Sequence, residues 1–263
     1  MRLIYIVLFL SITLNLTGCS SKTLEKPNEA AIYKQNSSDA ANDEFNEFLD
    51  EFEVEEVYDP FSGYNRVMTN FNDGAYEYVI KPVAKGYRYV LHAEIRESIR
   101  NFFNNLYFPM RFANNLLQGK FYNASEETGR FLINSTIGIL GLFDPAKAHF
   151  NLDAHKEDFG QTLGFYGVAS GPHIVLPLLG PSNLRDAISI YPDSLLSPID
   201  YTERSYWTLT DTWAEYLGVK TVENVNYASL NIEEYEKMKK DAVDLYPFLR
   251  DIYEQHRNKL IEE

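Results

Sequence analysis

The sequence predicts an all-α protein. Apolar residues recur at spacings of three and four along much of the chain, which is the period of an amphipathic helix. Strict alternation of apolar and polar residues is scarce, and no β-branched run is bounded by hairpin-type turn residues. The short apolar run 174–176, which ends at Pro177, could form a strand but is better interpreted as part of a loop.

Two helices are expected in the first two thirds of the chain. Over residues 95–106 the apolar side chains fall on one face, and charged residues such as Arg96 fall on the other. A second helix is expected to begin at Asn123, which precedes Glu126 by three residues as in a capping box. Its apolar positions continue to Phe143.

A third helix is expected near the C-terminal end. Apolar residues keep helical spacing over residues 235–260. Pro247 lies off that apolar stripe and should kink the helix, because proline removes a backbone donor and clashes with the preceding turn.

Residues 1–18 have the features of a bacterial signal peptide. Arg2 gives a basic start, and the apolar stretch 3–14 suits a signal-peptide core but is too short to span a bilayer. The sequence Leu-Thr-Gly-Cys that ends at Cys19 resembles the lipobox of bacterial lipoproteins. We therefore expect Cys19 to be lipidated and to begin the mature chain, and Ser20 after it favours the outer membrane. An ordinary signal peptide with a nearby cysteine is the alternative.

The segment 19–58 differs in composition from the rest. Ten carboxylates and no cation lie between Asp39 and Asp59, and their repulsion predicts an acidic flexible tether. A docking segment for a basic partner is the alternative. The formal net charge of −14 argues against binding to nucleic acid. Residues 59–263 are expected to form one helical domain.

The sequence offers little for catalysis. Residues 167–171 do not form a G-x-S-x-G nucleophile motif. Glu126 and Glu127 fit the first turn of a helix, where carboxylates interact favourably with the helix dipole. The residues considered for a metal site are His149, Asp153, His155, Glu157 and Asp158. They lack an H-E-x-x-H arrangement, and a polar loop that leads into a helix at Glu157 is the preferred interpretation. We expect no enzyme activity, no metal and no cofactor.

Several short blocks lie in order along residues 59–201. The first block is D-P-x-x-x-x-N-R at 59–66, followed by Phe-Asn at 71–72. The blocks at 157–167 and 171–186 are the most specific. Together these blocks resemble those of the MlaA (VacJ) family of outer-membrane lipoproteins. The block residues expected to support the fold are Asp59, Pro60, Asp144, Gly160, Gln161, Gly164, Gly167, Pro172, Pro177, Arg185 and Asp186.

The resemblance implies a ring-shaped assembly of amphipathic helices embedded in the inner leaflet of the outer membrane around a central channel. Mislocalised phospholipid would leave the outer leaflet through this channel and pass to a periplasmic carrier of the MlaC type, which maintains lipid asymmetry. A trimeric porin is a further implied partner. Two features depart from the family: the acidic tether is longer, and Pro192 lies where the resemblance implies a helix, which it would bend.

We expect the stretch from Asn65 to Asn72 to act as a gate for lipid. Asn65 and Arg66 have donors that could hold a neighbouring backbone or a phosphate. Phe71 beside Asn72 places an apolar ring next to a polar amide. The alternative is that Asn65 and Arg66 cap and brace the first helix. For the whole protein, the alternatives are a structural porin-associated lipoprotein without transport activity and, with less support, a periplasmic phospholipase.

Overall fold

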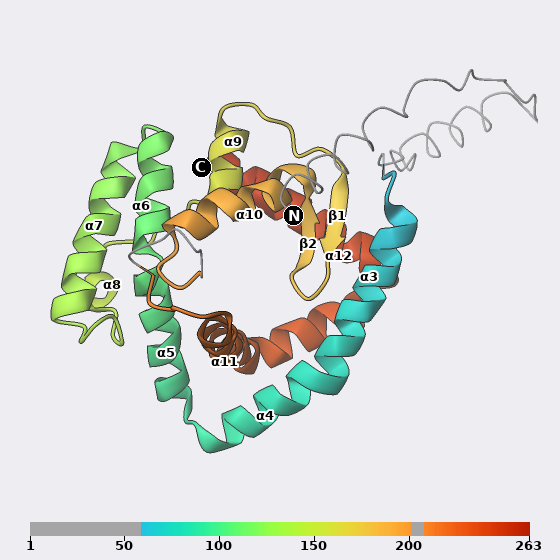
Figure 1. Cartoon of the computed structure of the whole chain (residues 1–263), viewed down its shortest axis with the longest axis horizontal. Helices are drawn as coiled ribbons and strands as arrows, with labels where there is room; N and C mark the ends of the chain where they lie inside the picture. Colours follow the sequence, from blue (N-terminus) through green and yellow to red (C-terminus); the bar gives the residue numbers. More distant parts are fainter. Residues whose placement is uncertain (1–58, 201–207) are drawn as a thin grey trace, which may run out of the picture. The chain divides into compact units, whose positions relative to one another are not determined.

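The computed structural model describes residues 59–200 and 208–263 (Figure 1). The predicted signal peptide, Cys19 and the predicted tether 19–58 lie outside the described residues. Helices dominate the described part of the chain, and one small two-stranded sheet accompanies them. The predicted all-α class is confirmed, with this hairpin as an addition.

The elements follow one another with short connections. In chain order they are α3 (Ser62–Ala75), η2 (Tyr76–Ile80), α4 (Lys81–Val90), α5 (Ala93–Leu106), α6 (Phe108–Leu117), α7 (Phe121–Thr136), α8 (Pro145–Phe150), α9 (Phe159–Phe165), β1 (His173–Leu176), β2 (Gly180–Asn183), α10 (Leu184–Leu196), α11 (Trp213–Asp241) and α12 (Leu245–Glu262).

The first three elements form one continuous helical arm (Figure 1). η2 is a π-helical segment, and the residues at both of its ends keep α-helical backbone angles. Pro82 follows in the first turn of α4. Proline inside a helix lacks its N–H and clashes with the carbonyl four residues earlier. The wider π-turn at Tyr76–Ile80 accommodates Pro82 without ending the helix.

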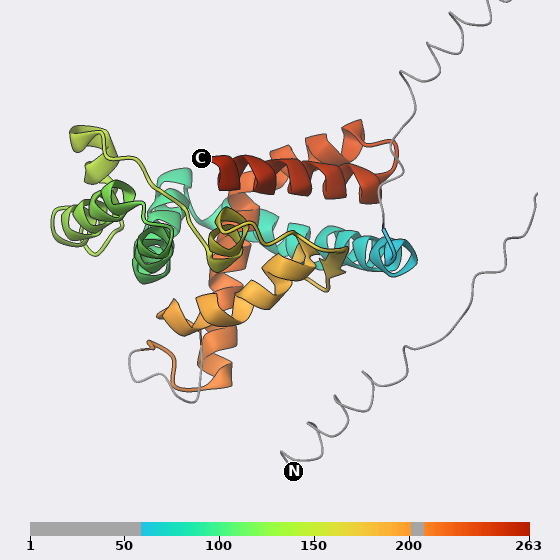
Figure 2. The same cartoon turned by 90° about the horizontal axis from the view of Figure 1, so that it is seen from above.

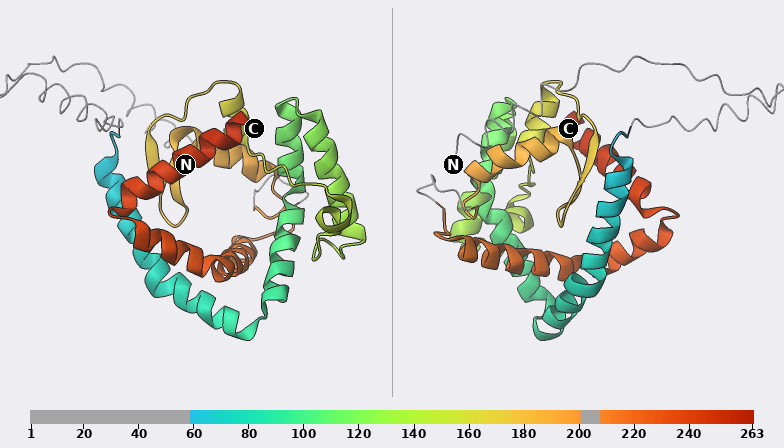
Figure 3. Two further views of the ribbon diagram at one scale, coloured as in Figure 1. Left: turned by 180° about the vertical axis from the view of Figure 1, so that it is seen from behind. Right: turned by 45° about the vertical axis from the view of Figure 1, so that its right-hand side comes forward.

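The arm contacts the other helices at both of its ends. α4 packs against α11, α11 against α5, and α6 against α7. α10 packs against α9 and α6, whereas α12 packs against α9 and α3. Seen from above, α12 and α10 lie on opposite sides of the arm (Figure 2). The view from behind shows α12 running from α3 to α9 (Figure 3), in agreement with these contacts.

The run 174–176 forms part of strand β1, so the loop interpretation was wrong. β1 pairs with β2 in antiparallel register, with Val175 opposite Pro181. The Val175 N–H donates to the side chain of Asn65 instead of to β2. Proline fits the opposite position, because Pro181 has no N–H to donate to Val175 in return. A strand of four residues forms here because α3 holds its outer edge, which no local sequence pattern reveals.

The helix boundaries differ from the sequence predictions at two places. α7 begins at Phe121 after Lys120, so Asn123 lies inside the helix and does not cap it. It ends at Thr136 because Ile139 and Leu140 adopt left-handed backbone angles. The C-terminal stretch is two helices separated at residues 242–244.

The two internal prolines have different settings. Pro247 lies in the first turn of α12, where a backbone N–H has no partner inside the helix. The predicted kink at Pro247 is therefore wrong. Pro192 lies inside α10, and this helix continues from Leu184 to Leu196.

The distribution of side chains is inverted relative to a water-soluble domain. Among the described residues, 25 buried residues are polar or charged and 8 are hydrophobic, whereas 37 large hydrophobic residues are exposed. The helix α5 illustrates this. Arg96 is buried and donates to the carbonyl of Ser229 at 2.7 Å, while Ile95 is 47% exposed. Arg96 and Phe103 are thus buried together, although the sequence assigns them to opposite faces of this helix.

No helix within residues 59–200 and 208–263 combines the length and the apolar character needed to cross a membrane.

Candidate functional site

Asn65 joins the helical arm to the β-hairpin and to α12. Its side chain is fully buried. Its amide nitrogen donates to the carbonyl of His173 and to the hydroxyl of Tyr246, both at 3.0 Å, and its amide oxygen accepts from the N–H of Val175 at 2.8 Å. Asp59 also accepts from this amide, at 3.3 Å, and from the Tyr246 hydroxyl. Asn65 therefore satisfies two backbone groups at the unpaired edge of β1.

Asn72 holds the tip of the same hairpin. It lies two turns after Asn65 on α3, so both side chains extend from the same face of the helix. Its amide nitrogen donates to the carbonyl of Leu176 at 2.9 Å, and its oxygen accepts from the N–H of Leu178 at 2.7 Å. Leu178 has a left-handed backbone angle and is 67% exposed. The pair of asparagines thus fixes an exposed apolar turn against α3.

Arg66 and Phe71 point elsewhere. Arg66 forms an ion pair with Asp244 at 2.5 Å, and its guanidinium lies 5.4 Å from the centre of the Tyr246 ring. Phe71 is 51% exposed. Asn65 and Asn72 therefore contact the hairpin, whereas Arg66 contacts the junction of α11 and α12. The contacts of Asn65 and Arg66 are those of the bracing alternative.

Two cavities adjoin one another beside α12. The hairpin cavity, of about 530 Å³, is lined by the β-hairpin, α10 and α11. The α6–α12 cavity, of about 510 Å³, is lined by α5, α6, α9 and α12. Asp158, Tyr253 and Arg257 line both, so these side chains form a common wall.

The walls of the hairpin cavity are amphipathic. Its apolar lining comes from Leu176, Leu179, Pro181, Ile190 and Leu217, and its charged lining comes from Asp158, Asp186, Asp193, Asp200, Lys220 and Arg257. A space with both kinds of wall suits a molecule that has a charged end and apolar chains.

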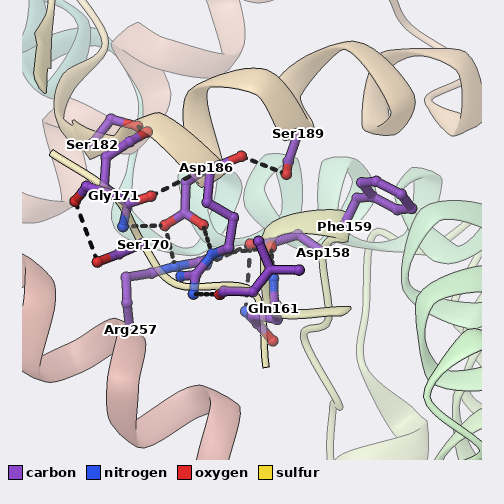
Figure 4. Close-up of polar contacts among 12 residues, drawn as sticks. Asp158, Phe159, Gln161, Ser170, Gly171, Ser182, Asp186, Ser189 and Arg257 are labelled. Carbon is purple, nitrogen blue, oxygen red and sulfur yellow. Dashed lines mark hydrogen bonds and ion pairs between the residues drawn. The ribbon is translucent and has the colours of Figure 1, made fainter. Parts of the chain in front are cut away.

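The common wall is a buried ion network (Figure 4). Arg257 binds both oxygens of Asp158, at 2.6 and 2.8 Å, and its Nε lies 2.8 Å from Asp186. Arg185 and the hydroxyl of Tyr253 also donate to Asp186. Burial alone would raise the pKa of Asp186, but these donors and the charge of Arg257 hold it below its ordinary value. Asp186 therefore stays charged at neutral pH.

Asp193 also lines the hairpin cavity, but its pKa is shifted in the direction opposite to that of Asp186. It accepts from the N–H of Phe159 and from Asn114. Burial raises the pKa of Asp193 to about 6. Its protonation therefore changes near physiological pH.

Two glycines of the sequence blocks, Gly160 and Gly164, allow the ion network to form. A Cβ on Gly160 would lie 2.4 Å from Asp186 Oδ1 and 2.7 Å from Arg257 Nη2. A Cβ on Gly164 would lie 2.5 Å from Ile261 Cδ1 and 2.9 Å from Arg185 Nη1. These positions require glycine because the ion network packs directly against the backbone of α9.

The other block residues have local structural contacts. Asp144 caps α8 and accepts from Arg130 at 2.8 Å and from Asn134 at 2.9 Å. Gln161 is buried, and its N–H donates to the cap residue Asp158. The remaining block residues lie at turns or at the ends of elements: Asp59, Pro60, Gly167, Pro172 and Pro177.

Four of the five side chains considered for a metal have other partners. Asp158 caps α9, as the preferred interpretation stated. His155 lies 2.6 Å from Glu126, and Lys120 lies 2.8 Å from Glu157. Asp153 pairs with Lys147, while His149 is exposed. In the described part of the chain no group of three or more such residues is placed to hold a metal ion.

The first-turn interpretation of Glu126 and Glu127 was wrong. Both lie beyond the first turn of α7. Glu127 is fully buried and pairs with Arg111 at 2.8 Å, so its charge is compensated by a side chain and not by the helix dipole.

Sequence reasoning missed most of the cavity lining. Tyr253 and Arg257 lie in the stretch 235–260, which the sequence described only as an apolar stripe, and Lys220 lies on α11 before that stretch. A buried arginine within an amphipathic helix is recognisable only from the carboxylates that surround it in the fold.

The fold and the site define a helical protein with a polar interior, an apolar exterior and adjoining amphipathic cavities. The family model described as MlaA lipoprotein matches residues 57–260. The chain belongs to the MlaA lipoprotein family.

Relatives and a solved structure agree with this assignment. The intermembrane phospholipid transport system lipoprotein MlaA of Escherichia coli is 30% identical over 203 residues, which cover 76% of this chain and 77% of that protein. An uncharacterized protein of Rickettsia typhi is 32% identical over 207 residues, 79% of each chain. A structure solved in work on the structural basis for maintenance of bacterial outer membrane lipid asymmetry is 30% identical, with a TM-score of 0.65, and the match covers 77% of this chain and 98% of that one.

Proposed function

We propose that this chain is an outer-membrane lipoprotein that moves phospholipid out of the outer leaflet and passes it to a periplasmic carrier of the MlaC type. Lipid asymmetry would be maintained by transport through the protein, without covalent chemistry. The observation that carries the proposal is the pair of adjoining cavities with both apolar and charged walls.

The exposed apolar residues support a position within one membrane leaflet. They occur all along the described chain, for example at Tyr89, Ile137 and Leu140, which are 92%, 64% and 68% exposed. So much apolar surface is costly in water and favourable in lipid. Acyl chains on Cys19 would add a second membrane anchor.

The order of helix contacts supports a ring around a central channel. Contacts lead from α3 through η2 and α4 to α11, then through α5 and α6 to α10, and back through β1 to α3. Phospholipid would pass through the space that these elements surround. A trimeric porin beside the ring remains part of the proposal.

The hairpin is the proposed gate. Its apolar turn at Leu178 and Leu179 adjoins the hairpin cavity, which Leu179 lines, and Asn72 holds that turn. Phe71→Ala should alter outer-leaflet phospholipid at normal protein abundance, while the matched variant Tyr78→Ala on the same arm should not. Equal lipid asymmetry in the two variant strains would mean that the stretch from Asn65 to Asn72 has only a structural role.

The function is tested by deleting the gene and restoring it. Outer-leaflet phosphatidylethanolamine, labelled on whole cells with an amine-reactive reagent, should rise on deletion and return with the restored gene. Changed porin content with unchanged asymmetry would favour the structural alternative. Radiolabelled phospholipid incubated with the purified protein should be recovered intact, and released fatty acid would favour the phospholipase alternative.

A further inference from the structure

A small polar pocket lies apart from the ion network at the common wall. We call it the asparagine pocket. It is enclosed by α5, α6, α7 and the segment that follows them, and its volume is about 40 Å³, which is room for about three water molecules. Its lining residues are Asn101, Asn104, Asn105, Arg111, Arg130, Asn134, Asp144, Ala154 and Lys156.

The lining carries an excess of positive charge. It contains the cations Arg111, Arg130 and Lys156 against the single carboxylate of Asp144. That carboxylate is already bound, because it accepts from Arg130, from Asn134 and from the N–H of Lys147. Burial would raise the pKa of Asp144, but these hydrogen bonds hold it below its ordinary value. Arg111 pairs with the buried Glu127 and Arg130 pairs with Asp144. Among the described lining residues, the ammonium of Lys156 is therefore the cation without a carboxylate partner.

Donors in this pocket lack acceptors. Arg130 is 8% exposed, and it donates to the carbonyl of Leu152 and to Asp144, but its Nε is buried without a partner. Within the described chain the side chains of Asn101 and Lys156 take part in no hydrogen bond or ion pair. Buried donors without acceptors are uncommon in folded proteins. The Nε of Arg130 is such a donor, while Asn101 is half-buried and Lys156 is exposed. An acceptor from outside the chain could bind all three.

The asparagine pocket connects with the lipid path. Asn104, Arg111 and Lys156 line both this pocket and the α6–α12 cavity. A molecule in that cavity can therefore place its polar end among these donors while its apolar part stays outside.

We propose that the asparagine pocket binds the oxygen atoms of a phosphate group. Guanidinium, ammonium and amide groups are the donors that phosphate oxygens prefer. The volume admits the few oxygens of a phosphate but not a sugar ring. The phosphate belongs either to a phospholipid, in which case the proposal rests on the proposed function, or to free inorganic phosphate.

The experiment uses phosphorus NMR on the full-length protein in a phosphorus-free detergent. Inorganic phosphate and dihexanoylphosphatidylglycerol are titrated separately, and binding is read from line broadening. The pocket variants are Asn101→Asp, which adds a carboxylate at nearly constant size, and Lys156→Gln, at an exposed site that preserves the fold. Their matched controls are Asn70→Asp on α3 and Lys147→Gln on α8.

Each pocket variant should weaken binding by about fivefold or more, because it adds a like charge beside the phosphate or removes a charged donor. The controls should bind like the wild type. Loss for the phospholipid alone assigns the phosphate to lipid, and loss for inorganic phosphate alone assigns it to the free ion. Binding that is equal in all variants, or absent for both probes in the wild type, overturns the proposal.

The two proposals fail separately. If deletion of the gene leaves asymmetry unchanged while Asn101→Asp loses inorganic phosphate, the pocket stands without lipid transport. If the gene maintains asymmetry while both pocket variants bind both probes normally, the pocket proposal fails alone.

Discussion

Replacing Asn72 by alanine should release the tip of the β-hairpin. The substitution removes a hydrogen bond to the carbonyl of Leu176 and one from the N–H of Leu178. Each bond contributes about 0.5–1.5 kcal/mol net. Both backbone groups can reach water after the change, so the local loss should be about 1–2 kcal/mol. A loss of that size corresponds to about tenfold faster opening of the hairpin.

Hydrogen exchange measures this loss directly. Peptides covering residues 174–183 of the full-length protein in detergent should exchange about tenfold faster in Asn72→Ala, while α7 keeps its protection. Asn70→Ala is the matched control, since Asn70 is exposed on the same helix and the described structure gives its side chain no hydrogen bond. Unchanged exchange of the hairpin in Asn72→Ala would refute the assignment of Asn72 as its clamp.

Three further predictions address the network, the titration and the anchor. Gly160→Ala should lower the free energy of unfolding by about 1–3 kcal/mol, because its Cβ would clash with the ion network. The control Gly63→Ala should not lower it, because no atom lies within 4 Å of a Cβ at that position. Thermal melts of the two variants measure the difference. Because the pKa of Asp193 is raised from 3.8 to about 6, native protein binds the proton more tightly, and stability relative to Asp193→Asn should fall by up to about 3 kcal/mol from pH 4 to pH 7. Denaturant titrations across that range that gave a constant difference would contradict this. Cys19→Ala should leave a species that no longer fractionates with the outer membrane, whereas mass spectrometry of an unmodified Cys19 in the mature wild type would end the lipidation hypothesis.

Helical periodicity was enough to predict the class of the fold, but not which face of each helix is buried. The usual inference takes the apolar face as the inner one. In α5 that inference holds only in part: Phe103 of the apolar stripe is buried, but Arg96 is buried as well and Ile95 is exposed. The period of a pattern is a property of the local chain, whereas the side that faces inward depends on the medium around the protein.

The β-hairpin and the common wall depended on contacts between distant segments. β1 is held by Asn65 and Asn72, which precede it by about a hundred residues, as the sequence separations of their hydrogen bonds show. The sequence blocks included Gly160 and Asp186, but not Arg257, which fills the space beside Gly160. Short blocks identify residues with special local requirements, while a buried cation is recognised only together with its partners.

The central claim is that phospholipid passes through the hairpin cavity, and blocking that cavity tests it most directly. Asn224 is exposed on α11 and lines the cavity, so Asn224→Trp should obstruct it, whereas Tyr227→Trp changes an exposed position on the same helix that is not part of this lining. Outer-leaflet phospholipid should rise to the level of the deletion strain with Asn224→Trp and stay at the wild-type level with Tyr227→Trp, at equal protein abundance. Wild-type asymmetry with a folded Asn224→Trp protein would contradict transport through this cavity.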